Sequence, residues 1–274
     1  MKMPSLSLSV LTLMAGLLSA PAAHADWTFS SVSGGVSTAT DGGIGVTASG
    51  VYAANGGGFV NNSAANYGIS GFASGATWAS SALISYSGGL GMSSDGSVQP
   101  NHAIDNGPKT NSSGTKVGLG NTEAVLLSFS SSVVLSSLTT GYVSGDSDFA
   151  VFKYDGTAAP SLTGTGAASM TGWTLVGNYN GVVNGGSGGT TLINSDGASS
   201  SWWLVSAYNS AWSDAKKNFG ALDQGNDYFK LFAVAGSKPS GSGGGSVPEP
   251  ASIALVAAAL LGVLGSRRRA TIRR

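Results

Sequence analysis

The sequence has no cysteine among its 274 residues. Without cysteine, the protein has no disulfide, no thiol nucleophile and no thiolate metal ligand. Charged residues are also scarce, at 9% of the chain, where an average soluble domain has about 25%. Helical periodicity is almost absent as well. The stability must therefore come from a hydrophobic core, and a body of about 210 residues is long enough to form one.

Arginine is absent until the C-terminal end, where all five arginines lie between residues 267 and 274. From Asp26 to Val247 the chain has twelve acidic residues and seven lysines, a formal charge of −5. Binding to nucleic acid requires clustered lysine and arginine to neutralise phosphates. We therefore expect no nucleic-acid partner for this acidic, arginine-free body.

The N-terminal segment has the three parts of a secretory signal peptide. Lys2 supplies a positive charge, Leu6 to Leu18 form an apolar run, and Ala23-His24-Ala25 is an A-x-A cleavage site. We expect residues 1–25 to form a signal helix that is removed after Ala25. A retained anchor helix is the weaker alternative, because the apolar run is short and ends at Pro21.

Short segments of alternating or continuous apolar residues fill the second half of the body, separated by Gly, Ser, Asn and Asp. Aromatic and β-branched residues between turn-rich flanks are typical of strands. The expected strands there are 123–129, 133–143 (after Ser130-Ser131-Ser132), 149–154, 173–179, 201–207 and 228–235.

The first half has weaker signals. We expect strands at 27–32, 44–52 and 78–86, a long polar loop at 91–119, and one short helical turn at 212–218. Many short antiparallel strands joined by polar turns predict an all-β fold, an antiparallel, jelly-roll-like β-sandwich over residues 26–236.

The C-terminal segment has the composition of a sorting signal. Residues 237–246 form a Gly/Ser linker, and the tail at 247–274 begins Val247-Pro248-Glu249-Pro250. The apolar run 251–265 is expected to form a transmembrane helix of about 22 Å, short of the ~30 Å hydrocarbon core. A cluster of three arginines follows it and is expected to stop translocation on the cytoplasmic side: Arg267, Arg268 and Arg269. A buried core helix is the alternative, but it leaves the linker and the arginines unexplained.

This tail resembles the PEP-CTERM sorting domain, which has the same signature, apolar helix and arginine cluster in that order. Pro248, Glu249 and Pro250 stand at the three signature positions. The resemblance implies export, a membrane-anchored precursor and processing by an exosortase, in bacteria that make extracellular polysaccharide. The mature protein is then expected at the cell surface or outside the cell. The same tail is also known as an ice-binding-protein C-terminal domain, a name that implies no ice binding here.

The body, from about Pro100 to Gly236, resembles a subset of exosortase-dependent surface proteins to which no activity is attached. The matching segments are PNHAIDN at 100–106, EAVLLSF at 123–129, GDSDFAV at 145–151, SWWLVSAY at 201–208 and DYFKL at 227–231.

Oxygen donors near the ends of the expected strands make a structural Ca²⁺ site the main cofactor candidate, since Ca²⁺ takes six to eight such ligands. The candidate ligands are Asp105, Glu123, Asp146 and Asp148, with Asn106 and Asp227 as further oxygen donors beside strand ends. Their spacing matches no known calcium loop, and aspartates that only form turns are the alternative. No other cofactor is expected.

Catalytic patterns are weak. His102 is the histidine that remains after signal cleavage, and a hydrolytic triad would need it with Asp105 and a serine such as Ser187 in Gly185–Gly189. A glycosidase would need a carboxylate pair such as Asp146 and Asp148. We therefore expect no enzyme, and a secreted hydrolase is the second alternative function.

Tryptophan is the remaining candidate for ligand binding, because its ring can stack on sugars. The residues concerned are Trp78, Trp173, Trp202, Trp203 and Trp212. Adjacent tryptophans on a strand point to opposite faces, so one of Trp202 and Trp203 is expected in the core. The leading expectation is a structural or adhesive surface protein associated with exopolysaccharide, and a carbohydrate-binding module is the first alternative.

Overall fold

The computed structural model describes residues 24–58, 68–96, 102–183 and 186–239. The chain divides into two units, Met1–Pro239 and Ser240–Arg274, and all described residues belong to the first. The signal peptide up to Ala23, most of the linker and the whole sorting tail lie outside the described residues. Within them, no helix has the length and apolar character that crossing a membrane requires.

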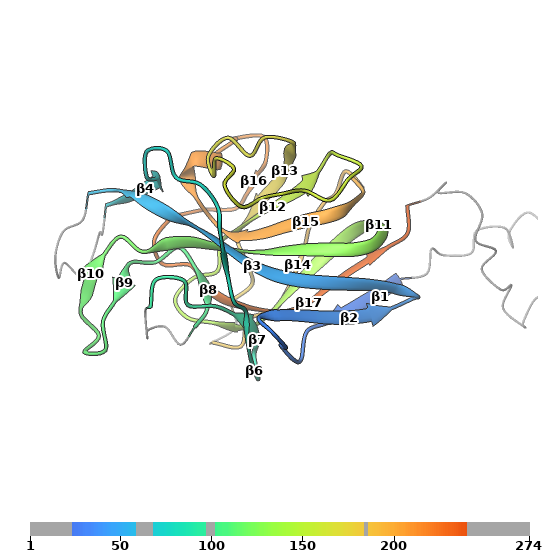
Figure 1. Ribbon diagram of the computed structural model, residues 1–274, viewed down its shortest axis with the longest axis horizontal. Coiled ribbons are helices and arrows are strands. Elements are labelled where there is room, and N and C mark those ends of the chain that lie inside the picture. Colours follow the sequence, from blue (N-terminus) through green and yellow to red (C-terminus); the bar gives the residue numbers. More distant parts are fainter. Residues whose placement is uncertain (1–23, 59–67, 97–101, 184–185, 240–274) are drawn as a thin grey trace, which may run out of the picture. The chain divides into compact units, whose positions relative to one another are not determined.

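The described residues form strands and a single 3₁₀ helix, so the all-β prediction is confirmed (Figure 1). The elements in chain order are β1 (His24–Thr28), β2 (Val36–Asp41), β3 (Ile44–Gly57), β4 (Ile69–Phe72), β5 (Ala79–Ser81), β6 (Ile84–Tyr86), β7 (Gly89–Gly91), β8 (Ile104–Asp105), β9 (Lys109–Thr110), β10 (Lys116–Gly118), β11 (Asn121–Val143), β12 (Phe149–Tyr154), β13 (Trp173–Tyr179), β14 (Thr190–Leu192), β15 (Ser200–Ala207), η1 (Ser210–Trp212), β16 (Asn218–Phe219) and β17 (Tyr228–Ser237).

Hydrogen bonds join 15 of these strands into one sheet, whose main order is β16-β13-β12-β15-β11-β17-β7-β6. Strand β3 pairs with β11 and also with β2, β4 and β5. Strands β9 and β10 form a separate two-stranded sheet. The strand pairs are antiparallel except for β13 with β16. The predicted jelly-roll connectivity stays a prediction.

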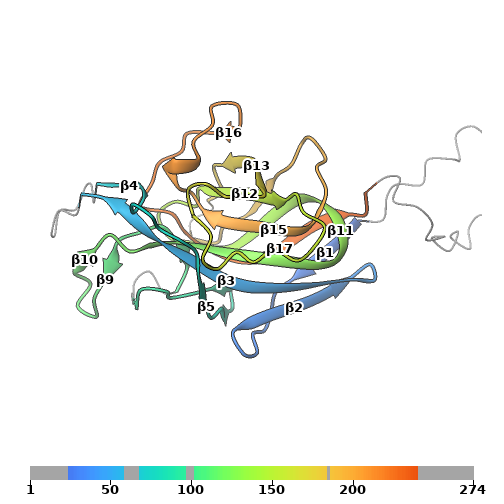
Figure 2. The ribbon, with the colours of Figure 1, turned by 45° about the horizontal axis from the view of Figure 1, so that its top comes forward.

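The 23-residue strand β11 organises this sheet. Its first part, Asn121–Phe129, pairs with β3 and β15, whereas its second part, Val134–Val143, pairs with β17 and β14. The pairing register shifts between Ser128 and Val133, and Figure 2 shows the curve of β11 there. A bend of this kind lets one strand pass from one set of partners to another.

Both parts of β11 contribute to the same core. Val125, Leu127 and Phe129 alternate on one face of the first part, and Leu135 and Leu138 follow in the second. A register shift between Leu135 and Ser137 keeps both leucines inward despite their odd spacing. The large side chains that complete this core are fully buried: Trp27, Phe149, Trp203 and Phe229.

A second apolar cluster covers the opposite face of β15 and β12. Leu204 and Phe152 point to it, and the segments that cross this face add Trp78, Met170 and Trp212. The indole nitrogens are satisfied internally: Trp78 Nε1 donates to Met170 Sδ (3.3 Å) and Trp212 Nε1 to the Ala167 carbonyl (3.0 Å). This cluster explains why β12 and β15 are apolar on both faces.

Several element predictions need correction. The triple serine at 130–132 does not end a strand, because β11 runs through it. The expected strand 78–86 is two strands, β5 and β6, and the expected loop 91–119 contains β8, β9 and β10. The helical turn lies at Ser210–Trp212, before the predicted 212–218, because Asn209 caps it by accepting a hydrogen bond from Ala211 N (3.0 Å).

Strand β1 begins within the predicted cleavage site. Ala25 is buried and pairs with Gly236, while Trp27 pairs with Val234. The Trp27 indole donates to the Ile44 carbonyl (2.8 Å). Cleavage after Ala25 would leave Asp26–Thr28 in the strand and keep this tryptophan in the core.

Candidate functional site

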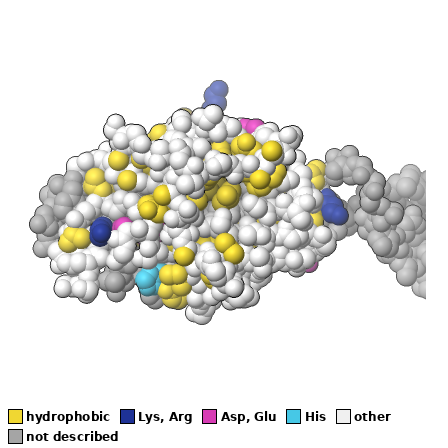
Figure 3. Space-filling view, viewed as in Figure 1, with side chains coloured by type: hydrophobic (Ala, Val, Ile, Leu, Met, Phe, Trp, Pro, Cys, Tyr) yellow, Lys and Arg dark blue, Asp and Glu magenta, His cyan; other side chains and the backbone are white. Residues whose placement is uncertain are grey.

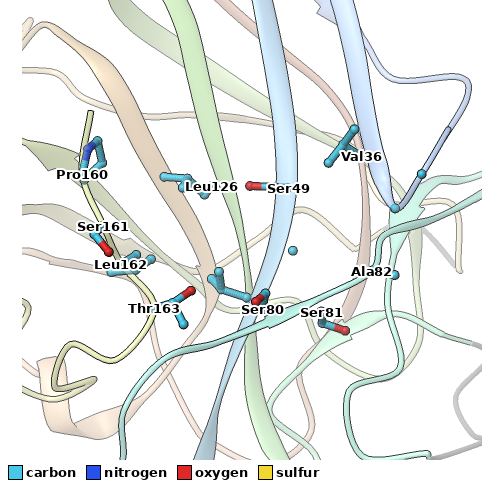
Figure 4. Close-up of a pocket in the computed structure, with 14 residues that line it drawn as sticks. Val36, Ser49, Ser80, Ser81, Ala82, Leu126, Pro160, Ser161, Leu162 and Thr163 are labelled. Atoms are coloured by element: carbon cyan, nitrogen blue, oxygen red, sulfur yellow. The ribbon is translucent and has the colours of Figure 1, made fainter. Parts of the chain in front are cut away.

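A neutral groove of about 550 Å³ lies beside the second apolar cluster. Figure 4 shows it between the loop with Pro160–Thr163 and the segment Ser80–Ala82, with Ser49 and Leu126 between them. Hydroxyl groups line it together with Leu126, Leu162 and backbone. None of its 14 lining residues is ionisable or aromatic. The groove therefore offers hydrogen bonds and apolar contact to a ligand, and no acid or base.

The aromatic side chains divide between core and surface. Trp78, Trp203 and Trp212 are buried, at 1%, 0% and 6% exposure. Trp202 and Trp173 are half-buried, and both contact Tyr154, with ring centroids 5.9 Å and 5.1 Å apart. The prediction that adjacent tryptophans point to opposite faces is confirmed. Of the five candidate tryptophans, Trp202 and Trp173 are the two with ring surface left for stacking on a sugar.

Four carboxylates converge where β11 leads into β12. Asp146 and Asp148 lie in the turn between these strands, and Asp223 and Asp227 lie in the segment before β17. One oxygen from each lies within 4.8 Å of the others. Backbone pairing holds the segments together, because Asp146 N donates to the Asn226 carbonyl (3.3 Å) and Tyr228 N to the Asp146 carbonyl (2.9 Å).

Within this four-carboxylate group, Asp148 and Asp227 have no exposed surface. Asp227 accepts hydrogen bonds from Asp148 N (2.7 Å) and from Asn106 Nδ2. Asp148 Oδ2 accepts one from Asp223 N (2.9 Å), whereas Asp148 Oδ1 is buried with no hydrogen-bond partner. One carboxylate oxygen is thus removed from water without compensation.

Burial sets the proton affinity of this group. It raises the pKa of Asp148 to about 7, and the charges of Asp146 and Asp223 add to the effect of burial. It also raises the pKa of Asp227 well above its ordinary value, with the charge of Asp148 acting in the same direction. Among the described residues no lysine, arginine or histidine forms an ion pair with any of the four.

The other two predicted metal ligands lie in a separate acidic centre. Burial raises the pKa of Glu123 to about 8, and that of Asp105 well above its usual range, with Glu123 and Asp95 contributing repulsion. Ser94 N donates to Glu123 Oε1 (2.8 Å), and Gly107 N to Asp105 Oδ1 (3.0 Å). Neither Asp105 nor Glu123 belongs to the four-carboxylate group.

The structure therefore divides the predicted calcium ligands. It brings Asp146 and Asp148 together with Asp227, and it adds Asp223, which the sequence reasoning missed. The available signal for Asp223 was the polar turn Asp223-Gln224-Gly225-Asn226-Asp227 directly before a strand. Asn106 links the region internally, because its Oδ1 accepts hydrogen bonds from Gly225 N and Asp227 N (both 3.2 Å).

His102 does not have the hydrogen bond that a histidine of a hydrolytic triad requires. Its ring stacks on Tyr86, with centroids 5.6 Å apart and an interplanar angle of 7°. Its Nδ1 is buried and has no hydrogen-bond partner among the described residues. A triad needs that nitrogen bonded to an orienting carboxylate.

Comparison with known proteins identifies the C-terminal segment. The PEP-CTERM protein-sorting motif matches residues 246–269, which include Val247–Pro250 and Arg267–Arg269. No curated protein and no solved structure matches the chain. The motif indicates a secreted, membrane-anchored precursor that an exosortase processes for the cell surface or the extracellular space.

Proposed function

We propose that this exosortase-sorted protein has a structural or adhesive role in the extracellular polysaccharide layer. The PEP-CTERM motif supports the location, because it directs the chain to the surface where such polymers accumulate. We also propose that the body is a β-sandwich, since the two parts of β11 pair with different strands and share one core.

The neutral groove is the single observation that carries the polysaccharide proposal. Ser49, Ser80, Ser81, Ser161 and Thr163 bring hydroxyl groups to it, and hydroxyl groups donate and accept hydrogen bonds. A polyhydroxylated chain can use both roles. The volume is also within the ~300–1,000 Å³ range of small-molecule sites.

Carbohydrate binding at the aromatic trio of Trp202, Tyr154 and Trp173 is the alternative. These half-buried rings lie on neighbouring strands β15, β12 and β13. Their mutual tilts of 51° and 82° do not form a flat platform, which favours the groove as the binding surface.

We further propose that the protein is not an enzyme, with a secreted hydrolase as the remaining alternative. The groove lining has no group that transfers a proton. The face in Figure 3 likewise has few, scattered charged side chains.

The test measures binding of the processed protein to a glycan array and to exopolysaccharide from an exosortase-bearing host. Ser161→Trp fills the groove from an exposed position, and Thr157→Trp is its control in the same exposed loop outside the groove. We expect Ser161→Trp to weaken binding at least tenfold and Thr157→Trp to leave it unchanged. A loss caused by Trp202→Ala alone would favour the aromatic trio, and no binding to any glycan would refute both.

A further inference from the structure

The four-carboxylate group has no part in the proposed function. The close approach of its acidic side chains requires an explanation. Four acidic side chains meet there, and no ion pair reaches them among the described residues. A fully buried carboxylate oxygen, Asp148 Oδ1, has no hydrogen-bond partner. Asn226 Oδ1, beside Asp227 in the chain, is buried and unpartnered as well.

These two observations are independent of each other. Four carboxyl groups lie close together, and repulsion between their ionised forms opposes the fold. The unpartnered Asp148 Oδ1 additionally loses hydration without a replacement contact. A cation satisfies both requirements, because it neutralises the charges and supplies a contact for the unpartnered oxygen.

We propose that Asp146, Asp148, Asp223 and Asp227 bind one Ca²⁺ ion. Carboxylate oxygens are hard ligands, which Ca²⁺ prefers, and Ca²⁺ holds its oxygens at about 2.3–2.6 Å. Ligands on opposite sides of such an ion are about 4.6–5.2 Å apart, so oxygens that lie within 4.8 Å of one another fit one coordination sphere. Asp223 is exposed and leaves the ion accessible to solvent.

The ion would cross-link two segments that are distant in sequence. Asp146 and Asp148 precede β12, and Asp223 and Asp227 precede β17, so the ion ties the β16–β17 connection to the turn after β11. The hydrogen bond that Asp223 N donates to the Asp148 side chain at Oδ2 already joins these segments. We expect Ca²⁺ to stabilise the fold, independently of any polysaccharide binding.

The test uses the processed protein after treatment with a chelator. Adding Ca²⁺ at 100 times the Kd should raise Tm by about 5–10 °C. Tb³⁺, which replaces Ca²⁺, should show luminescence sensitised by Tyr208, whose backbone N donates to the Asp148 carbonyl (3.0 Å). Mg²⁺ serves as the comparison ion.

Two variants locate the ion. Asp223→Asn removes the negative charge of the exposed ligand and should reduce the Ca²⁺-dependent rise in Tm and the Tb³⁺ signal. Asp214→Asn, at an exposed aspartate outside the group, should keep both. No Tm response in the parent protein, or an undiminished response in Asp223→Asn, would overturn the proposal. A glycan-binding result of either sign leaves this test unaffected.

Discussion

Glu123 is a buried carboxylate whose protonation should affect the stability of the protein. It lies on the same face of β11 as Val125 and Leu127 and is 2% exposed. The charge of Asp95 raises the pKa of Glu123 further. The hydrogen bond from Ser94 N favours the ionised form but does not offset burial.

The raised pKa gives stability a defined dependence on pH. The folded protein holds a proton on Glu123 up to about pH 8, whereas the unfolded chain releases it near pH 4.5. Unfolding between these values therefore releases a proton, so the stabilisation present below pH 4.5 is lost as pH rises to 8. We expect Tm to fall across this window, and Glu123→Gln to reduce the fall.

Part of the fall should persist in the variant, because the pKa values of Asp105, Asp148 and Asp227 are raised in the same direction. Asp41→Asn, which removes a carboxylate outside both acidic centres, is the control and should keep the fall that Glu123 causes. The fall is measured as Tm from pH 4 to 9, with a chelator present, in the parent and in both variants. An identical slope in Glu123→Gln and the parent would refute the assignment of a buried, protonated glutamate.

At the scale of elements, β7 packs so closely that it requires glycine. A Cβ on Gly91 would lie 1.7 Å from the His102 carbonyl oxygen, and the pairing of Gly91 with Ile84 fixes the position of Gly91 in the sheet. A Cβ on Gly58, at the end of β3, would have no atom within 4 Å.

Gly91→Ala should therefore destabilise the protein by about 1–3 kcal/mol through overpacking. Gly58→Ala should be neutral or stabilise it by up to about 1 kcal/mol, because alanine restricts the unfolded chain. Urea unfolding monitored by tryptophan fluorescence measures both. Equal midpoints for the two variants would contradict the close approach of β7 to His102.

Sequence patterns predicted the strands whose apolar content is high. The bounds of β12 and β13 match the expected 149–154 and 173–179, and β15 and β17 differ by one or two residues at an end. Short strands such as β2 and β14 were missed, because their own residues are mostly polar, and β14 and β16 pair with strands distant in sequence. The Ser130-Ser131-Ser132 break was wrong because β11 continues through these residues, where its pairing register shifts.

The candidate site was predicted only in part. The Gly-Asp-Ser-Asp turn identified Asp146 and Asp148, but their partner Asp227 lies 79 residues beyond Asp148. Only the pairing of the two segments brings these residues together. Asp105 and Glu123 are also carboxylates near the ends of expected strands, so sequence alone could not separate the two acidic centres. No sequence pattern predicted the groove that Ser80 and Ser161 line, because serine is common throughout the chain.

At the scale of the whole molecule, the folded body and the sorting motif occupy separate parts of the chain. The folded body is contained in Met1–Pro239, while the sorting motif occupies residues 246–269. The sequence predicts a Gly/Ser linker between them, which would give a membrane enzyme access without unfolding the body. We expect the arginines after the apolar run to oppose complete translocation, at roughly 2.5–3.5 kcal/mol each on the insertion scale.

The most direct test of the central claim follows the processing of the full chain in a host with an exosortase. Pro248, Glu249 and Pro250 are replaced by alanine together, and immunoblots of membrane and surface fractions measure the size and location of each product. The parent should appear at the surface in a shortened form, and the triple variant should stay uncut in the membrane. If both proteins reach the surface in the same mature form and amount, the tail is not a sorting signal.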